Sequence, residues 1–229
     1  MLVIIPARGG SRGVPGKNLK KLKGKPLIQY TIEAAQEVFK NENILVSTDD
    51  TEIKSLAEEL GLEVPFLRPA HLASDKSGMY EVLLHSLDFV ESHGLKYETI
   101  VLLQPTSPFR TSEHILEAIE LFNNSGEVDM VTSVKETKSN PYYLLKEENR
   151  EGFLESSKAG FFVRRQDCPK VWELNGAIYV INVNSLKSSP MHQFKKVKKY
   201  VMDFIPSHDI DDYVDWKLAE IFCQDSRDH

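Results

Sequence analysis

Residues 2–18 read LVIIPARGGSRGVPGKN, and this stretch decides the class of fold. Residues 2–5 form a continuous apolar run of strand length, which is typical of a strand covered on both faces. The loop that follows holds glycines at positions 9, 10, 13 and 16 together with the cations Arg8, Arg12 and Lys17. Glycines let the backbone approach a ligand, and cations at the carboxyl end of a first strand suit a polyphosphate. The stretch therefore predicts an α/β protein whose first loop holds a phosphorylated ligand.

Two familiar phosphate-binding loops do not match this one. A Walker A loop needs a glycine five residues before Gly16 and a Ser or Thr after Lys17, but this chain has Ser11 and Asn18 there. A dinucleotide fingerprint needs glycines at i, i+2 and i+5, and the glycines of this loop never provide that spacing. The remaining alternative is a mobile basic loop without a ligand.

Short apolar runs alternate with amphipathic stretches through the first half of the chain. The apolar runs predict strands at residues 44–47, 63–67, 99–103 and 129–134. The amphipathic stretches predict helices at residues 26–39, 53–60, 82–90 and 112–122. Pro26 is expected as the first residue of its helix, Thr51 as a cap and Gly61 as a stop signal. This alternation predicts a mostly parallel sheet with helices on both faces.

The pattern changes after Val134. Residues 135–170 are polar and charged with weak periodicity, which predicts an insertion, arm or lid outside the sheet. Residues 176–181 and 197–202 predict further strands, and residues 211–222 predict a closing helix. Asn175 and Gly176 are compatible with a simple hairpin turn. Because no linker or repeat divides the sequence, we expect a single domain spanning residues 1–229.

The composition argues against several classes of protein. Lys and Arg number 28 against 34 Asp and Glu, and the net charge of −6 argues against a general nucleic-acid or anionic-membrane surface. Cys168 and Cys223 form neither a disulfide framework nor a CxxC metal site. The apolar runs fall far short of the roughly 18 residues of a membrane span, and the N-terminus lacks the basic start of a signal peptide. The expected location is the cytoplasm, with no nucleic-acid or membrane partner.

Seven segments of this sequence, taken in order, resemble those of the acylneuraminate cytidylyltransferases, also called CMP-sialic acid synthetases. They begin at residues 6 (PARGGSRGVPGKN), 44 (ILVSTD), 67 (LRPAHLASD), 102 (LLQPTSPFR), 164 (RRQDCP), 175 (NGAIY) and 209 (DID). The resemblance runs from residue 1 to 222. It implies the nucleotide-diphospho-sugar transferase fold, which is Rossmann-like, with a mostly parallel mixed sheet flanked by helices and a dimerisation arm.

Members of this family join CTP to a nine-carbon acidic sugar and release pyrophosphate. The resemblance implies that the nucleotide is bound by Arg8, Gly9, Gly10, Ser11, Lys17, Asn18, Arg68 and Ser77, with Ser74 and Asp75 also near the cytosine. Lys17 matches a lysine that contacts the phosphates, and Arg68 matches an arginine that can donate to the O2/N3 edge of cytosine. Lys17, Arg8 and Asp211 are the expected catalytic residues.

The same resemblance assigns residues to the sugar. Gln104 matches a sugar-contacting glutamine, and Asn175 opens the strand that leads to the site. Arg165 matches an arginine that reaches the sugar acid from the arm of the other subunit, which implies a homodimer with exchanged arms. Arg110 has two interpretations, either shaping the loop after Gln104 or decorating the start of a helix.

Asp209 and Asp211 are the expected metal ligands. Their period-two spacing places both carboxylates on one side of an extended segment, and two oxygen ligands suit Mg²⁺, with Mn²⁺ as the alternative. Another interpretation is that Asp211 or Asp212 caps the last helix. In the expected mechanism the anomeric hydroxyl attacks the α-phosphorus of CTP in line. Mg²⁺ bridges phosphate oxygens, and Lys17, Arg8 and loop amides hold the triphosphate.

The sequence departs from the family pattern near the sugar. Glu173 stands where several sialic-acid enzymes carry arginine, and Tyr142 and Tyr143 lie where a basic residue can occur. N-acetylneuraminic acid is therefore the first expectation, with legionaminic, pseudaminic or another nonulosonic acid as the alternative and Kdo after them. A hexose-1-phosphate nucleotidyltransferase and a non-catalytic nucleotide-binding regulator are the other hypotheses.

Overall fold

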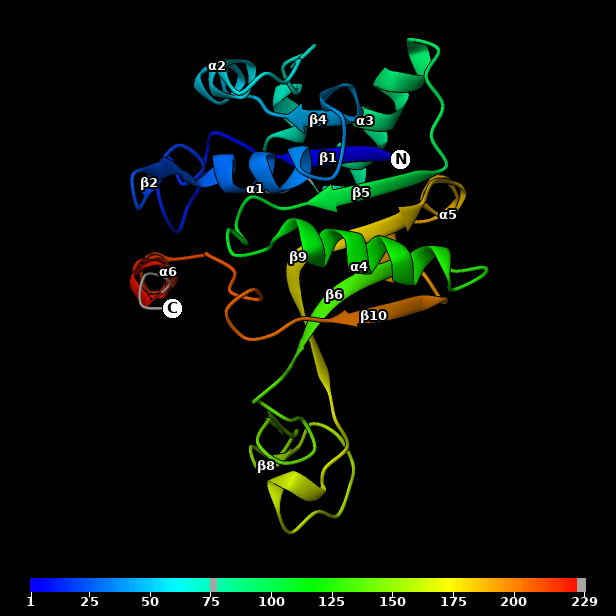
Figure 1. Cartoon of the computed structure of the whole chain (residues 1–229). Helices are drawn as coiled ribbons and strands as arrows, with labels where there is room; N and C mark the ends of the chain where they lie inside the picture. The colour runs from blue at the N-terminus through cyan, green and yellow to red at the C-terminus, as the bar shows by residue number, and fades with distance from the viewer. Residues whose placement is uncertain (75–77, 226–229) are drawn as a thin grey trace.

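The computed structural model describes residues 1–74 and 78–225. A six-stranded sheet with the order β10-β6-β9-β5-β1-β4 forms its centre (Figure 1). The strands are β1 (Leu2–Pro6), β4 (Ile44–Ser47), β5 (Thr99–Leu103), β6 (Met130–Glu136), β9 (Trp172–Asn182) and β10 (Val197–Val201). β9 runs antiparallel to β5 and β6, while the other neighbouring pairs are parallel. The predicted α/β class and mostly parallel mixed sheet are confirmed.

Helices cover both faces of this sheet. They are α1 (Leu27–Gln36), α2 (Thr51–Glu59), α3 (Met79–Ser92), α4 (Ser112–Asn123) and α5 (Val183–Ser188), while α6 (Tyr213–Asp225) packs in a separate smaller core. Alternate residues of β1 face opposite sides: Val3 and Ile5 pack with α1, α2 and α4, whereas Leu2 and Ile4 pack with α3 and α5. Burial on both faces explains the unbroken apolar run, since each such side chain contributes about 1.5–3 kcal/mol. Among the described helices, none combines the length and apolar character needed to cross a membrane.

A smaller core lies beside the end of β1 and joins distant parts of the chain. Val14 of the glycine-rich loop packs there with Leu22, Leu27, Ile210, Trp216 and Ala219. Leu22 belongs to a short hairpin, β2 (Lys21–Leu22) and β3 (Lys25–Pro26), which the sequence analysis treated as loop. This core holds the glycine-rich loop against the segment that precedes α6.

The helix boundaries differ from the sequence predictions for local reasons. Pro26 precedes α1 instead of opening it, because it pairs with Lys21 in the hairpin and has a non-helical ψ of 140°. Asp50, and not Thr51, caps α2, and its side chain accepts from the backbone N–H groups of the first turn. Gly61 follows the end of α2 with a φ of +84°, as predicted. Asp212 caps the start of α6 by accepting from the N–H groups of residues 214 and 215.

Residues 63–67 form no strand, which corrects the sequence prediction. Val64 is buried in the core on one face of the sheet, and Phe66 packs against the core on the other face. The carbonyl of Val64 accepts a hydrogen bond from Lys54 Nζ at 2.8 Å instead of pairing with a strand. The alternation of apolar residues here reflects burial on both sides of the chain. The segment does not extend the sheet, in which β4 is the last strand.

β6 and β9 continue as a ribbon beyond the sheet, and the segment between them projects away from it (Figure 1). The projection is residues 137–171, because Lys135 and Glu136 still pair with β9. It contains β7 (Lys146–Glu148), β8 (Leu154–Ser156) and the 3₁₀ turn η3 (Arg165–Asp167). We call residues 137–171 the arm. Its apolar side chains Phe153, Leu154, Phe161 and Val163 are 66%, 72%, 104% and 85% exposed, respectively.

Candidate functional site

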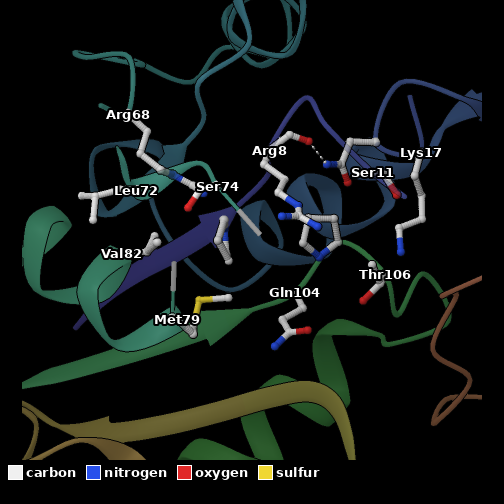
Figure 2. Close-up of a pocket in the computed structure, with 14 residues that line it drawn as sticks. Arg8, Ser11, Lys17, Arg68, Leu72, Ser74, Met79, Val82, Gln104 and Thr106 are labelled. Atoms are coloured by element: carbon white, nitrogen blue, oxygen red, sulfur yellow. Dashed lines mark hydrogen bonds between the residues drawn. The ribbon is translucent and has the colours of Figure 1, made fainter. Parts of the chain in front are cut away.

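A cleft of about 330 Å³ opens where β1 and β5 end (Figure 2). Because the carboxyl ends of parallel strands meet at one edge of a sheet, the loops after β1 and β5 form its walls. Seven residues that were predicted for the site from the sequence line it, namely Arg8, Ser11, Lys17, Asn18, Arg68, Ser74 and Gln104. Arg8 and Gln104 lie between Arg68 at one end of the view and Lys17 at the other.

The glycines of the first loop allow close backbone packing. Gly9 N donates to Asp49 Oδ1 at 3.0 Å, and a Cβ at Gly9 would lie 2.4 Å from Asp50 Oδ2. A Cβ at Gly13 would lie 1.9 Å from the carbonyl oxygen of Asp211, so only glycine fits there. Gly10 has open space at its Cβ position. Two of the four glycines therefore pack the loop against its neighbours, while Gly10 leaves room beside it.

Lys17 connects the cleft to the acidic segment before α6. Its side chain is only 11% exposed, and Nζ donates to the carbonyl of Ile210. The same Nζ lies 3.6 Å from Asp211 Oδ1. Asn18 supports the loop from the other side, because its Nδ2 donates to the carbonyl of Arg8 at 2.9 Å. An ammonium group held in this way is a fixed positive charge at the wall of the cleft.

The two candidate metal ligands differ in their surroundings. Asp209 Oδ1 is buried and meets no donor in standard hydrogen-bond geometry among the described residues, although the Thr106 hydroxyl is close enough to lower the pKa of the carboxyl. Burial raises the pKa of Asp209, the charges of Asp211 and Asp215 raise it further, and Thr106 and Lys17 lower it. The Asp211 side chain is 80% exposed, so one of the two carboxylates is buried and the other lies at the surface. That both point to one side of the segment stays a prediction.

These residues fit a divalent cation bound together with a substrate. A buried carboxylate oxygen without a partner is costly unless a cation or donor meets it, and hard oxygen ligands suit Mg²⁺. In the described part of the chain, no group of three or more His, Cys, Asp or Glu side chains could hold a metal by itself. A metal on Asp209 and Asp211 would therefore need phosphate oxygens and water to complete its shell, which is how Mg²⁺ usually binds.

Gln104 and Asp209 meet across a glycine of β9. Gly176 has a φ of +73°, and a Cβ there would lie 3.4 Å from Gln104 Oε1 and 3.5 Å from Asp209 Oδ2. Gly176 lies inside β9, near an irregularity in the β6–β9 register, and not in the simple hairpin turn that its sequence suggested. Neither this role nor that of Thr106, which lines the cleft in the loop after β5, was predicted from the sequence.

Arg68 lies buried at the far end of the cleft from Lys17. Its Nε donates to Ser47 Oγ at 3.1 Å, and its Nη2 donates to the carbonyl of the same serine. Burial lowers the pKa of the Arg68 guanidinium, and the charge of Asp49 opposes that shift. Ser74 lines the cleft nearby, whereas Asp75 and Ser77 lie outside the described residues.

Two of the residues assigned to the sugar do not line the cleft. Arg165 lies in the 3₁₀ turn η3 of the arm and is not among the residues that line the cleft. Asn175 is buried, its Nδ2 donates to Ser207 Oγ at 2.9 Å, and its Oδ1 accepts from Ser133 Oγ at 2.6 Å. Asn175 thus holds the segment before Asp209 against the sheet.

Arg110 is buried, which corrects its interpretation as a surface charge at a helix start. It is only 3% exposed, and its guanidinium donates to the carbonyls of Gln104 and Ala177. Thr111 caps α4 next to it and gives the local sequence the appearance of an exposed helix start. The loop from Gln104 to Arg110 folds inward instead.

A second hollow of about 620 Å³ adjoins the cleft and shares Gly78, Met79 and Gln104 with it. Its further lining includes Leu102, Met130, Tyr179, Met191 and His192. The cleft carries Arg8, Lys17 and Arg68, whereas no Lys or Arg lines the hollow among the described residues. Gln104 therefore stands between a cationic compartment and a largely apolar one.

A cationic cleft at the carboxyl ends of parallel strands, with the carboxylate of Asp211 close to Lys17, is typical of an α/β protein that binds a phosphorylated ligand. The sequence profile of the family described as "Cytidylyltransferase" matches residues 2–225. The chain belongs to this cytidylyltransferase family and is an enzyme of that type.

Two relatives agree with this assignment, and a solved structure shares the fold. The chain is 36% identical over 220 residues to "N-acylneuraminate cytidylyltransferase" of Escherichia coli O18:K1:H7, covering 96% of this chain and 51% of the relative. It is 33% identical over 221 residues to "CMP-N,N'-diacetyllegionaminic acid synthase" of Legionella pneumophila, covering 96% and 94%. A structure of CMP:2-keto-3-deoxy-manno-octonic acid synthetase complexed with CTP superposes with a TM-score of 0.70 at 17% identity, covering 98% of both chains. That structure shares the fold.

Proposed function

We propose that this enzyme transfers CMP from CTP to the anomeric hydroxyl of a nonulosonic acid and releases pyrophosphate. The observation that carries the proposal is the position of Lys17, whose ammonium group lies between the cleft and the carboxylate of Asp211. Two relatives at 33–36% identity are named for CMP transfer to such acids, and they support this substrate class.

The residues in and around the cleft have different roles in this reaction. Arg68 lies where it can meet the base, while Arg8, Lys17 and the loop amides hold the triphosphate and the departing pyrophosphate. Gln104 orients the acidic sugar so that its anomeric hydroxyl attacks the α-phosphorus in line. Asp209 and Asp211 would hold Mg²⁺, which supplies charge neutralisation at the phosphate oxygens when bound. Asn175 serves the site indirectly, by fixing the segment that carries Asp209.

The acid favoured first is N-acetylneuraminic acid, and legionaminic and pseudaminic acids are the alternatives. Glu173 supports keeping these alternatives open, because it lies 3.4 Å from Lys135 in a cross-strand pair at the base of the arm. Because position 173 is a glutamate, no arginine is available there for the sugar carboxylate. Lys135 balances the charge of Glu173.

The test is pyrophosphate release with CTP and Mg²⁺ across N-acetylneuraminic, legionaminic, pseudaminic and Kdo acids. We expect one nine-carbon acid to be turned over well above the rest, because the hollow beside Gln104 distinguishes substituents by shape. Omitting the acid is the control for CTP hydrolysis. Kdo as the best substrate would overturn the nonulosonic assignment, and CTP binding without pyrophosphate release for any acid would favour a nucleotide-binding regulator.

We propose further that two copies of the chain pair through their arms and that Arg165 reaches the partner's cleft. The arm exposes the apolar side chains of Phe153, Leu154, Phe161 and Val163, and no other part of the same chain that the structure describes covers them. Such exposure is typical of a surface that binds another protein chain. Arg165 lies two residues after Val163 in the arm and is not among the residues that line the cleft of its own chain, which supports an exchanged arm.

Sedimentation velocity is expected to give a dimer, and Phe161→Ser is expected to shift it toward monomer and to reduce activity with it. The reason is that Phe161 is fully exposed in the single chain and its burial would drive association. Leu116→Ser, which removes an exposed apolar side chain from α4, should change neither property. A monomer with full activity would refute the exchanged arm.

A further inference from the structure

Arg110 is a buried cation without an acidic partner among the described residues. Burial lowers the pKa of its guanidinium to about 9, which leaves it charged at neutral pH. Nη1 donates to the carbonyls of Gln104 at 3.1 Å and Ala177 at 2.9 Å, and Nη2 donates to Thr31 Oγ1 at 2.6 Å. Nε is buried without a hydrogen-bond partner among the described residues. Burying a charge costs free energy, so we look for a role of this guanidinium that a neutral side chain could not fill.

The three acceptors lie on three elements that build the cleft. Gln104 directly follows β5, and Ala177 lies in β9 directly after Gly176. Thr31 lies on the buried face of α1, the helix that follows the glycine-rich loop. The planar guanidinium presents its donors in a fixed fork, so it sets the relative positions of all three elements.

Ala177 is the contact that reaches the reacting region. A Cβ at the adjacent Gly176 would lie 3.4 Å from Gln104 Oε1 and 3.5 Å from Asp209 Oδ2, so both side chains border the space that this glycine leaves open. Arg110 holds the backbone of Gln104 and the backbone next to Gly176 with a single nitrogen. Arg110 therefore fixes the backbone that carries Gln104 relative to the backbone beside the gap that Gln104 and Asp209 border.

We propose that Arg110 is a positioning residue that sets the Gln104–Asp209 spacing and thereby the binding of the acidic sugar, with little influence on CTP. This inference rests on the proposed function. Gln104 borders the hollow that lacks Lys and Arg among the described residues, whereas Lys17 and Arg68, which serve CTP, make no hydrogen bond with Arg110 there. A displacement of Gln104 should therefore weaken binding of the acidic sugar more than binding of CTP.

The test compares Arg110→Lys and the pair Thr31→Val and Thr31→Ser with the wild-type enzyme. We expect Arg110→Lys to lower kcat/KM for the acid by about tenfold to a hundredfold, because a shift of roughly 1 Å at a reacting group has effects of that size. The dissociation constant for CTP, measured by calorimetry, should stay within about threefold, because the groups serving CTP are unchanged. Thr31→Val removes only the Nη2 acceptor and should raise KM for the acid, which lowers kcat/KM as Arg110→Lys does. Thr31→Ser keeps the hydroxyl and should leave KM for the acid at the wild-type value.

Ile115→Ala is the control for lost stability, because Ile115 is buried in the same core without a polar link to the site. It should lower Tm and leave the ratio between the acid KM and the CTP dissociation constant unchanged. If Arg110→Lys behaves like Ile115→Ala, or if Thr31→Val and Thr31→Ser have the same acid KM, Arg110 is only a structural residue and the inference is wrong. Absence of turnover by the wild-type enzyme with every acid would overturn the proposed function and this inference together.

Discussion

Replacing Lys17 with alanine is expected to lower kcat by about a hundredfold or more, because loss of one charged contact to the departing pyrophosphate costs roughly 3 kcal/mol. The side chain is 11% exposed, so its charge acts on the cleft with little screening by solvent. The substitution also removes the hydrogen bond to Ile210 and the ion pair with Asp211. We therefore expect a smaller effect on CTP affinity than on kcat, since the charge that Lys17 meets grows as the phosphate bond breaks.

Two further variants separate charge from folding. Lys21→Ala removes an exposed lysine from the adjacent hairpin and should leave kcat unchanged. Lys17→Arg keeps the charge but places a larger planar group in a buried slot, so it should be intermediate. Steady-state pyrophosphate release gives kcat, and thermal unfolding reports whether the loop still packs. An Ala variant within about threefold of the wild type would contradict a role in catalysis.

The parts of the fold that were predictable depend on neighbours close in sequence. The apolar run of β1 and the stop at Gly61 both follow from local residue types, and the structure confirms them. The error at residues 63–67 arose because burial of Val64 and Phe66 on opposite sides gives the same alternation as a paired strand. Only the sheet order, with β4 at its end, distinguishes the two cases.

The site shows the same division between local and distant information. The glycine-rich loop identifies Lys17 as a cation near a ligand, but its partner Ile210 lies 193 residues away in sequence. The sequence left Arg110 with two interpretations because Thr111 beside it begins a helix, and only the packing of β5, β9 and α1 reveals that Arg110 is buried. Arg165 lies in the arm and does not line the cleft of its own chain, so a single chain does not show which cleft it serves.

Replacing Asp209 with asparagine is expected to lower kcat by about a hundredfold or more and to raise the Mg²⁺ concentration needed for half-maximal activity, because a neutral amide is a weaker ligand for a hard cation. Asp203→Asn, an exposed acid in the same segment, is the matched control and should change neither quantity. Titrating Mg²⁺ at saturating CTP measures both effects.

The stability of the ligand-free protein should move in the opposite direction to activity. Burial raises the pKa of Asp209 above its ordinary value, so its ionised form is less favourable in the folded chain than in the unfolded chain. The folded state therefore binds more protons between the two pKa values, and stability falls as the pH rises through that window. Asparagine removes this loss, so at neutral pH the ligand-free variant should have a Tm equal to or above that of the wild type. A variant that is less active and also clearly less stable without Mg²⁺ would contradict this account. It would then be a folding defect at the segment that Asn175 and Ser207 hold in place.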